Sequence, residues 1–349
     1  MSIFCSWKKI EWGDFLESDL KEACKKSFSS LSALSRAEIL IVGAGGFVGS
    51  WISAVLIYAK DQYRFDYGIT LTYQNVAKIS KILNLTELKN VKIIEGNLEE
   101  VANEVFKAQL NFSHVIHAAT PTSRNFQRID NEYIVDGTSK LINEVSARIK
   151  PNFIHLSSGA IYGLPARQIA NISEIQSNSP VNLENWEYAK CKREIEELVV
   201  KSSKDGKLNG SNPRLFSFIG PHLPIDNTFA IGEFVSKAIE KKKIIVNGSL
   251  TSTRSYMYPT DMVTWVLSIL VKPTIEVTHV GSEYAIQMMQ LAETVNYVFE
   301  GVGVESTNSQ DLPNHYVPET IQTRQKYNLN ECVSLKQGLE RWKSWLKSD

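Results

Sequence analysis

Cysteine is scarce in this chain of 349 residues, and so is any signal for metal binding. Its four cysteines lie far apart, with no C-x-x-C pair and no Cys/His cluster. A structural zinc site is therefore not expected, and no metal site is predicted. Scattered cysteines suit a reducing compartment, so we expect a cytoplasmic protein.

Excess charge and long apolar runs are also missing. The chain carries 38 basic and 38 acidic residues, which gives a formal net charge of zero. General nucleic-acid binders usually have a basic excess, so nucleic acid is not an expected partner. No run of about eighteen apolar residues is present and no N-terminal run resembles a signal peptide, so we expect no membrane association.

The stretch 37–60 is the feature around which the chain is organised. An apolar, β-rich run at 39–42 ends in glycines, and apolar residues at helical spacing follow. Gly43, Gly46 and Gly49 give the spacing G-x-x-G-x-x-G. A strand that runs into a glycine turn and a helix start can cradle a pyrophosphate, because backbone and helix N-terminus face the negative charge. An ordinary tight turn is the alternative interpretation.

Strands alternate with helices through about residue 220. Strands are expected at 67–72, 91–94, 114–119, 152–156 and 213–221, and helices at 129–149 and 186–201. This alternation predicts an α/β fold with a parallel sheet covered by helices on both faces. The last third is more mixed, with helices expected at 229–239, from Met262 and at the C-terminus, and a short strand at 244–246.

Three regions follow from this pattern. Residues 1–36 are expected to form an N-terminal helical extension, because 14–35 have helical periodicity. Residues 37–220 form the predicted dinucleotide-binding domain. Residues 221–349 form a predicted substrate-binding region, from which some chain returns to the sheet.

Two strand ends bear on the cofactor. The second strand ends at Tyr73-Gln74-Asn75, where dinucleotide folds use an acidic residue for the adenosine ribose or a basic one for a 2′-phosphate. Neither is present, so NAD and NADP both stay open. The fourth strand ends in the small residues Ala118 and Ala119, which leave room for a ligand or for helix packing.

Tyr188 and Lys192 are four residues apart on a predicted helix and therefore share a face. A phenol has a pKa of about 10, and a nearby ammonium favours its phenolate form. Ser158, at the end of the fifth strand, could hold a substrate oxygen beside the phenol. This set suits proton exchange with a sugar hydroxyl while a nicotinamide takes or gives hydride.

In this order, the motifs resemble those of the extended short-chain dehydrogenase/reductases, the NAD-dependent sugar-nucleotide epimerase/dehydratase family. The resemblance covers about Ile39 to Trp345. It rests on GAGGFVG (43–49), HAA (117–119), SSGAIYG (157–163), YAKCK (188–192), RLFSFIGP (214–221) and RSYMYPTD (254–261). It implies a Rossmann-like, doubly wound parallel sheet with a smaller C-terminal mixed α/β substrate-binding region.

The resemblance also implies site residues. The implied catalytic set is Ser158, Tyr188 and Lys192. The implied cofactor contacts are Gly43, Gly46, Phe47, Gly49, Tyr73, Asn97, Leu98, Ala118, Ala119, Tyr188 and Lys192. The implied contacts to a nucleotide-diphosphate sugar are Ser158, Ser217, His222 and Arg254. The arginine suits the diphosphate because its planar fork binds oxygen pairs, although an ion pair with Asp261 is an alternative.

Departures from the family pattern narrow the reaction. Gly159 and Ala160 stand where 4,6-dehydratases carry an Asp-Glu pair, and neither can transfer a proton. The Glu that family decarboxylases usually keep nearby is also missing. The segment Ser-Ser-Gly-Ala-Ile-Tyr-Gly resembles the pattern of the family's 4-epimerases, so we expect an NAD(P)-dependent nucleotide-sugar epimerase that works through a keto-sugar intermediate. A one-way NAD(P)H-dependent reductase of 4-keto-6-deoxy sugars and a non-catalytic dinucleotide sensor remain alternatives, and the intact catalytic set disfavours the sensor.

The family further suggests an assembly and a pathway. Its members commonly pair through the helix after the fourth strand and the helix that carries the tyrosine. Both helices have apolar faces in this sequence, which would be a liability in a monomer. We predict a homodimer, and the family suggests a role in polysaccharide biosynthesis.

Overall fold

The computed structural model describes residues 14–74, 91–120, 128–163, 172–174, 187–307 and 312–348. The chain divides into two compact units, which are treated separately below. The first comprises Met1–Ile161, Leu183–Arg214 and Val263–Val277, and the second comprises Tyr162–Asn182, Leu215–Met262 and Thr278–Asp349. The regions proposed from the sequence, with boundaries at residues 36 and 220, stay predictions.

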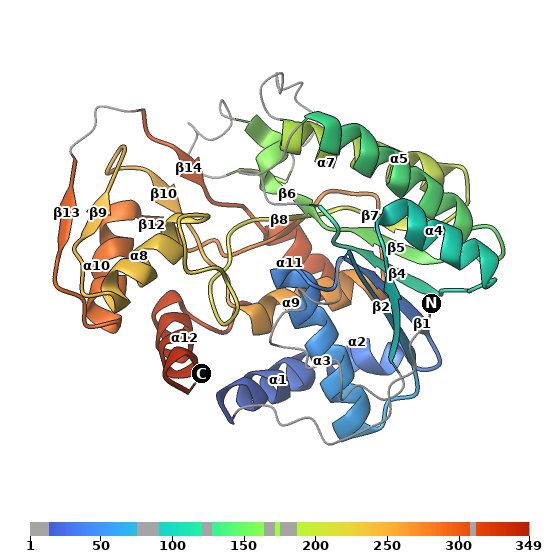
Figure 1. The fold of residues 1–349 in the computed structure, drawn as a ribbon, viewed down its shortest axis with the longest axis horizontal. Helices are drawn as coiled ribbons and strands as arrows, with labels where there is room; N and C mark the ends of the chain where they lie inside the picture. Colours follow the sequence, from blue (N-terminus) through green and yellow to red (C-terminus); the bar gives the residue numbers. More distant parts are fainter. Residues whose placement is uncertain are drawn as a thin grey trace. The chain divides into compact units, whose positions relative to one another are not determined.

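The first unit is built on a six-stranded parallel sheet in the order β3-β2-β1-β4-β5-β7 (Figure 1). The strands are β1 Glu38–Val42, β2 Gly68–Tyr73, β3 Val91–Glu95, β4 His114–His117, β5 Asn152–His155 and β7 Asn209–Ser211. The apolar runs in β1 and β4 suit strands that are buried on both faces. The strand order reverses beside β1, so the predicted Rossmann-like sheet is confirmed.

The last strand of this sheet is not the one predicted. The expected strand at 213–221 is reduced to β8, Pro213–Leu215, which belongs to a different sheet. The sixth position is taken by β7, whose sequence Asn-Gly-Ser has no apolar signal. Gly210 permits this placement, because a Cβ there would come within 2.3 Å of the Ser203 side chain on the covering helix.

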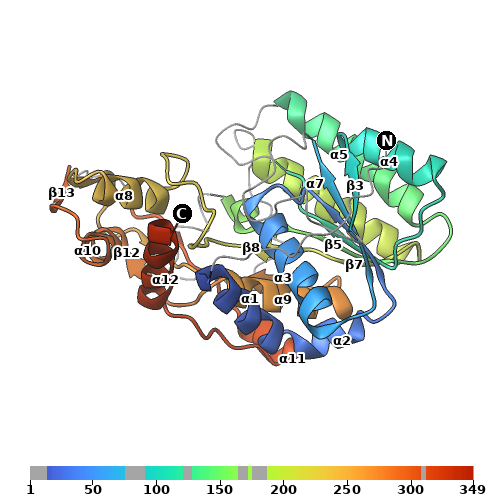
Figure 2. The same cartoon turned by 60° about the horizontal axis from the view of Figure 1, so that its bottom comes forward.

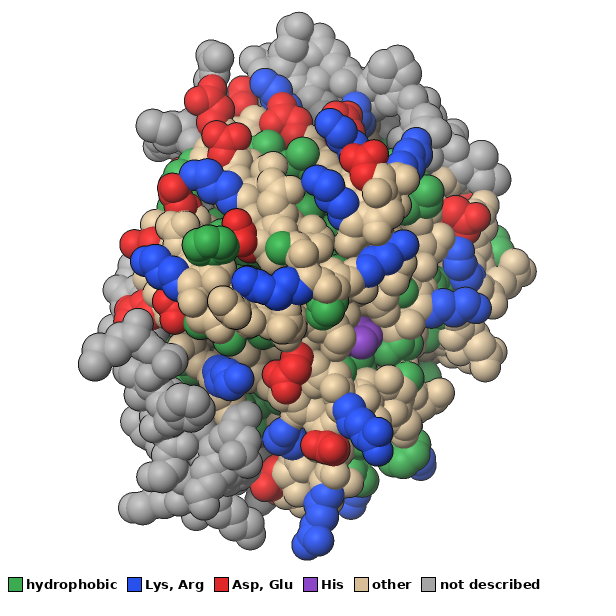
Figure 3. Space-filling view, turned by 90° about the vertical axis from the view of Figure 1, so that its right-hand side faces the viewer, with side chains coloured by type: hydrophobic (Ala, Val, Ile, Leu, Met, Phe, Trp, Pro, Cys, Tyr) green, Lys and Arg blue, Asp and Glu red, His purple; other side chains and the backbone are tan. Residues whose placement is uncertain are grey.

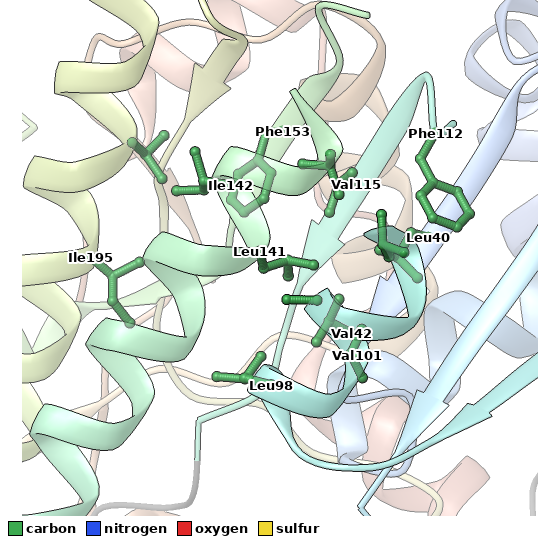
Figure 4. Close-up of a cluster of buried hydrophobic side chains, with 14 of the residues drawn as sticks. Leu40, Val42, Leu98, Val101, Phe112, Val115, Leu141, Ile142, Phe153 and Ile195 are labelled. Atoms are coloured by element: carbon green, nitrogen blue, oxygen red, sulfur yellow. The ribbon is translucent and has the colours of Figure 1, made fainter. Parts of the chain in front are cut away.

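Helices cover both faces of the sheet, as predicted (Figures 1 and 2). Helices α4 Leu98–Lys107, α5 Arg128–Val145 and α7 Glu187–Lys204 lie on one face, and α3 Phe47–Tyr63 lies on the other. Between the first three helices and the strands is an apolar core (Figure 4). It includes Leu40, Val42, Val115 and Phe153 from the strands, and Leu98, Val101, Leu141, Ile142 and Ile195 from the helices. Burying each such side chain contributes roughly 1.5–3 kcal/mol.

The helical periodicity at 14–35 corresponds to two helices, α1 Asp14–Lys26 and α2 Phe28–Ala33. Leu20 and Cys24 of α1 are fully buried, and the Cys24 thiol points to the Val55 carbonyl of α3 at 3.7 Å. Ser27, just before α2, donates to Thr264 of α9 (Pro259–Val271) at 3.1 Å. These helices therefore extend the layer that covers the α3 face.

The second unit is mixed α/β, in line with the predicted C-terminal region. A parallel pair joins β9 Ile244–Val246 to β13 Val304–Ser306, and a three-stranded sheet has the order β12-β10-β14. The three strands of this sheet are β10 Thr253–Arg254, β12 Ile286–Gln287 and β14 His315–Tyr316. Its helices are α8 Ala230–Ile239, α10 Met288–Val298, α11 Ile321–Tyr327 and α12 Leu335–Ser348. Strand β11, Thr278–Val280, also lies in this unit.

Charged side chains of both signs are interspersed on the face shown in Figure 3. Among the helices in the described ranges, none is long and apolar enough to span a bilayer.

Candidate active site

The glycine turn follows directly from the carboxyl end of β1. The register pairs Val42 with Thr72 on β2 and with His117 on β4. The next residue, Gly43, has a φ of +84°. A Cβ at this position would lie 2.8 Å from the backbone of Ala118 and Ala119, so both conformation and space require glycine.

The other two motif glycines have different surroundings. Gly46 is the N-cap of α3 and is exposed, and a Cβ there would meet nothing nearer than the Gly43 carbonyl at 3.7 Å. Gly49 is buried in the first turns of α3, where a Cβ would come within 2.3 Å of the same carbonyl. Gly49 thus allows α3 to pack closely against the turn at Gly43, while Gly46 leaves its backbone accessible to a ligand. The turn and the helix N-terminus, which begins at Phe47, fit the pyrophosphate of a dinucleotide.

Three further cofactor candidates lie on the second and third strand ends. Tyr73 is buried with its ring against Gly45, and its hydroxyl has no hydrogen-bond partner among the described residues. Burial raises the pKa of this phenol. Asn97 caps α4, its side-chain oxygen accepting from the Glu100 amide at 3.0 Å, so an adenine contact would fall to its side-chain nitrogen. The Leu98 side chain lies in the core, which leaves its backbone for a cofactor contact.

Ser158 lies in the two-residue strand β6, Ser157–Ser158, and is followed by the turn Gly159–Tyr162. The Ser158 hydroxyl oxygen accepts a hydrogen bond from the Ala160 amide at 3.1 Å. Since the bond uses a lone pair of the oxygen, the hydroxyl proton stays available for donation. Gly159 and Ala160 therefore shape the backbone around the serine and supply no acid or base.

Helix α7 carries Tyr188 and Lys192 one turn apart. The Lys192 nitrogen lies 5.8 Å from the centroid of the Tyr188 ring and donates to the Leu156 carbonyl at 2.6 Å, two residues before Ser158. Tyr188 is half-buried and Lys192 is buried. Burial lowers the pKa of Lys192 to about 8, against an opposing effect of Cys191 and Glu196. The structure thus brings this lysine to both the tyrosine and the chain segment of the serine.

A buried histidine pair lies under this segment and was not anticipated from the sequence. The Nδ1 atoms of His117 and His155 are 3.2 Å apart, and Nε2 of His117 is 3.0 Å from the Thr138 hydroxyl. That hydroxyl donates to the Ile134 carbonyl at 2.7 Å. His117 therefore donates from Nε2 and accepts at Nδ1, so His155 donates from Nδ1.

Burial lowers the pKa of both histidines, for His117 to about 3, and the charge of Lys192 adds to this. In these neutral forms, Nε2 of His155 is an acceptor that has no partner among the described residues. No sequence motif predicts this pair. The two histidines are 38 residues apart in the chain and become neighbours only because the register of β4 and β5 pairs His117 with His155.

Apart from Ser158, which belongs to the first unit, the predicted substrate contacts lie in the second unit. Ser217 is half-buried, and its carbonyl accepts from the Met257 amide at 3.0 Å. His222 has a φ of +69° and its ring lies 4.6 Å from that of Trp345. Arg254 on β10 donates through one nitrogen to the carbonyls of Thr253 and Asn314, at 2.8 and 2.6 Å. Desolvation lowers the Arg254 pKa. These substrate roles stay predictions.

No group of three His, Cys, Asp or Glu side chains within the described ranges is arranged to hold a metal ion. The first unit offers a backbone turn at a helix N-terminus, the Ser158 hydroxyl, the Tyr188 phenol and the Lys192 ammonium. This set of groups is the one expected of a nicotinamide-dinucleotide-binding α/β protein with a Tyr-x-x-x-Lys site.

Comparison with known proteins agrees with this class. A model of the NAD dependent epimerase/dehydratase family matches residues 39–281, and the chain belongs to that family. The family's NAD dependence confirms the predicted nicotinamide cofactor.

Relatives within the family differ in their reactions. UDP-glucuronic acid decarboxylase 1 of Arabidopsis thaliana is 24% identical over 310 residues, covering 88% of this chain and 69% of its own. The chain spans 66% of the length of two further decarboxylases from this plant.

Two solved structures share the fold. The UDP-glucose 4-epimerase of Thermotoga maritima, with UDP-glucose, has a TM-score of 0.74 at 19% identity, covering 89% of this chain and 98% of its own. The dTDP-glucose 4,6-dehydratase of Bacillus anthracis, with NAD, has a TM-score of 0.72 at 18% identity, covering 90% and 97%. At these identities, the likeness establishes the fold and leaves the reaction to the site.

Proposed function

We propose that this protein is an NAD(P)-dependent nucleotide-sugar epimerase that inverts a hydroxyl-bearing carbon through a keto-sugar intermediate. The observation that carries the proposal is the combination of Ser158, Tyr188 and Lys192 with Gly159 and Ala160. The first three residues are sufficient for proton exchange at a sugar hydroxyl. The last two lack the acid and base that removal of water needs.

The residues of this chain would act as follows. The Tyr188 phenolate, favoured by the Lys192 ammonium, accepts the proton of the sugar hydroxyl as its carbon is oxidised to a ketone. A bound nicotinamide supplies the hydride acceptor and donor. Ser158 donates its free hydroxyl proton to the sugar oxygen and holds it beside the phenol. After the keto-sugar turns, Tyr188 returns the proton as hydride re-enters on the other face, so no net proton or electron is consumed.

The names of the relatives suggest where to begin. A UDP-sugar is the first substrate to test, because UDP-glucose occupies the epimerase structure and the curated decarboxylases act on UDP-glucuronic acid. Arg254 is the candidate for the diphosphate, since guanidinium groups bind phosphate oxygens in pairs. The homodimer stays a prediction that light scattering would test, and a monomer would contradict it.

The experiment combines cofactor retention with product analysis. The protein is purified without added cofactor, its bound nicotinamide is quantified, and it is incubated with UDP-glucose and with UDP-glucuronic acid while products are followed by NMR. We expect retained NAD near one per chain and an inverted sugar without CO₂ release. Release of CO₂ would instead establish a decarboxylase. An empty site that binds NADPH and reduces a nucleotide 4-keto-6-deoxy sugar would establish the reductase.

Tyr188→Phe provides the matched control. The variant lacks one hydroxyl, so we expect turnover to fall at least ~10²-fold while bound NAD is unchanged, since the lost group exchanges the proton. An unchanged turnover would contradict the assigned role of Tyr188. If neither protein turns over any of these sugars while both bind NAD, the sensor interpretation gains support.

A further inference from the structure

Three side chains of α7 hold the short segment that contains Ser158. Lys192 donates to the Leu156 carbonyl at 2.6 Å, and Arg193 donates to the Ile161 carbonyl at 2.8 Å. Between these contacts, the Ser157 hydroxyl donates to the Glu196 carboxylate at 2.5 Å. The helix that carries Tyr188 therefore makes hydrogen bonds to the segment 156–161 at positions before and after Ser158.

Glu196 is the most constrained member of this group. Its side chain is buried, and Arg214 binds it through two bonds, Nε to Oε1 at 3.0 Å and a terminal nitrogen to Oε2 at 2.7 Å. Its backbone carbonyl accepts from the Asn212 side chain at 3.2 Å. A paired, bidentate arginine compensates the burial of the carboxylate and fixes its orientation. The Ser157 hydroxyl is thus bound to a group that has little freedom to move.

The geometry explains why this bond bears on Ser158. Successive side chains of a strand point to opposite faces, so fixing Ser157 from the α7 side sets the direction of Ser158 without occupying its hydroxyl. Glu196 lies one helical turn beyond Lys192 and two turns beyond Tyr188. One rigid helix therefore carries the phenol, the ammonium and the carboxylate that locates the serine.

We propose that Glu196 is a positioning residue, which through Ser157 sets the place of the Ser158 hydroxyl relative to Tyr188 and Lys192. This inference rests on the proposed function. Its consequence is kinetic, because displacement of a reacting group by about 1 Å can lower a rate by about 10²-fold. The Glu196–Arg214 pair by itself would serve only to stabilise the fold, so the test must separate positioning from stability.

Ser157→Ala makes that separation. It removes only the hydroxyl contact and leaves the buried ion pair intact, so the protein should still fold, with a thermal midpoint lowered only by the loss of this one bond. We expect kcat to fall about 10-fold, with KM and the dissociation constant of NADH within twofold of wild type. Glu196→Gln should lower kcat about 100-fold, because it loosens the carboxylate from Arg214 and weakens its contact with Ser157. Ser157→Ala should add less than its own effect in that background, because both changes act on the same contact. Glu197→Gln, an exposed neighbour on α7, is the matched control and should be silent.

The pH profile separates the effect of the Glu196 charge on Lys192 from the positioning effect through Ser157. Lys192 is faced by Tyr188, Cys191 and Glu196 on α7, by His117 on β4 and by His155 on β5. Because Glu196 raises the pKa of Lys192, Glu196→Gln should shift the basic limb of kcat to lower pH. Ser157→Ala keeps the carboxylate and should leave that limb in place.

The outcomes are distinct. A folded Ser157→Ala protein with wild-type kcat would overturn the positioning role, whatever Glu196→Gln does. Equal effects of Glu196→Gln and Glu197→Gln would also overturn it. A wild-type protein without turnover on any nucleotide sugar would overturn the proposed function first, and this inference with it.

Discussion

The glycine turn and the Ser158 segment both lie at strand ends of the first unit, yet they are built in opposite ways. The turn at 43–49 presents mainly backbone, because its glycines have no side chains, and Gly45 and Gly46 are exposed. The segment 156–161 is buried or nearly so and is held by three side chains of α7.

This contrast matches the role proposed for each region. A pyrophosphate is bound by N–H groups and a helix N-terminus, which need open backbone. A proton exchange needs hydroxyl, phenol and ammonium in one fixed arrangement, which needs long-range contacts. Contacts of the second kind span 32 to 39 residues here, so they depend on the whole sheet being in place.

Lys192→Met should give the largest effect and separate activity from stability in the Ser158 region. Loss of the ammonium should lower kcat by about 10³-fold. The pKa of the buried lysine falls from 10.5 to about 8, so keeping it charged costs roughly 3 kcal/mol at neutral pH. The inactive variant should therefore be more stable and unfold at a higher temperature. The gain in the free energy of unfolding is reduced by about 1 kcal/mol, because the bond to the Leu156 carbonyl is lost.

The sign of the pH dependence follows from the same shift. Between about pH 8 and 10.5 the unfolded lysine holds a proton that the folded one has lost, so wild-type stability rises with pH and the advantage of Lys192→Met shrinks. Urea unfolding at pH 7 and 10 would measure this. Lys190→Met, an exposed change on the same helix, is the control. A less stable Lys192→Met protein would contradict the cost assigned to burial.

Gly49→Ala and Gly46→Ala test the glycine turn against itself. The added methyl of Gly49→Ala would lie 2.3 Å from the Gly43 carbonyl. We therefore expect the free energy of unfolding to fall by about 3 kcal/mol and NADH binding to be lost. Gly46→Ala has room for its methyl and should keep stability while weakening NADH, because it covers exposed backbone. Chemical denaturation and NADH fluorescence titration measure the two properties. Equal stability losses would show that the turn is not open at Gly46.

The histidine pair gives the smallest expected effect. The pKa of His117 is about 3 in the folded protein and 6.5 in the reference state, so the unfolded chain binds more protons between these values. Stability is therefore lost as pH falls below 6.5, by about 2 kcal/mol between pH 7 and 5 for His117 alone. Urea unfolding of His117→Gln should show a correspondingly smaller loss over that range. An identical loss in variant and wild type would place the acid sensitivity elsewhere.

Much of the fold could be predicted because its signals are local. The apolar run at 39–42, the three glycines and the four-residue spacing of Tyr188 and Lys192 each act within one or two turns of chain. Strand β7 was not predicted because its sequence, Asn-Gly-Ser, has no apolar pattern. Its position also depends on Gly210 packing against α7, which the local sequence does not reveal.

The sequence by itself determined the local geometry of the glycine turn and the placement of Tyr188 and Lys192 on one helix face, since glycine spacing and helical spacing are properties of neighbouring residues. Only the tertiary structure decided how those groups are held. Glu196 meets Ser157 and Arg214, and His117 meets His155, through sheet register and helix packing. The physical reason is that such contacts cost chain entropy to form and are stabilised only once the core between sheet and helices is complete.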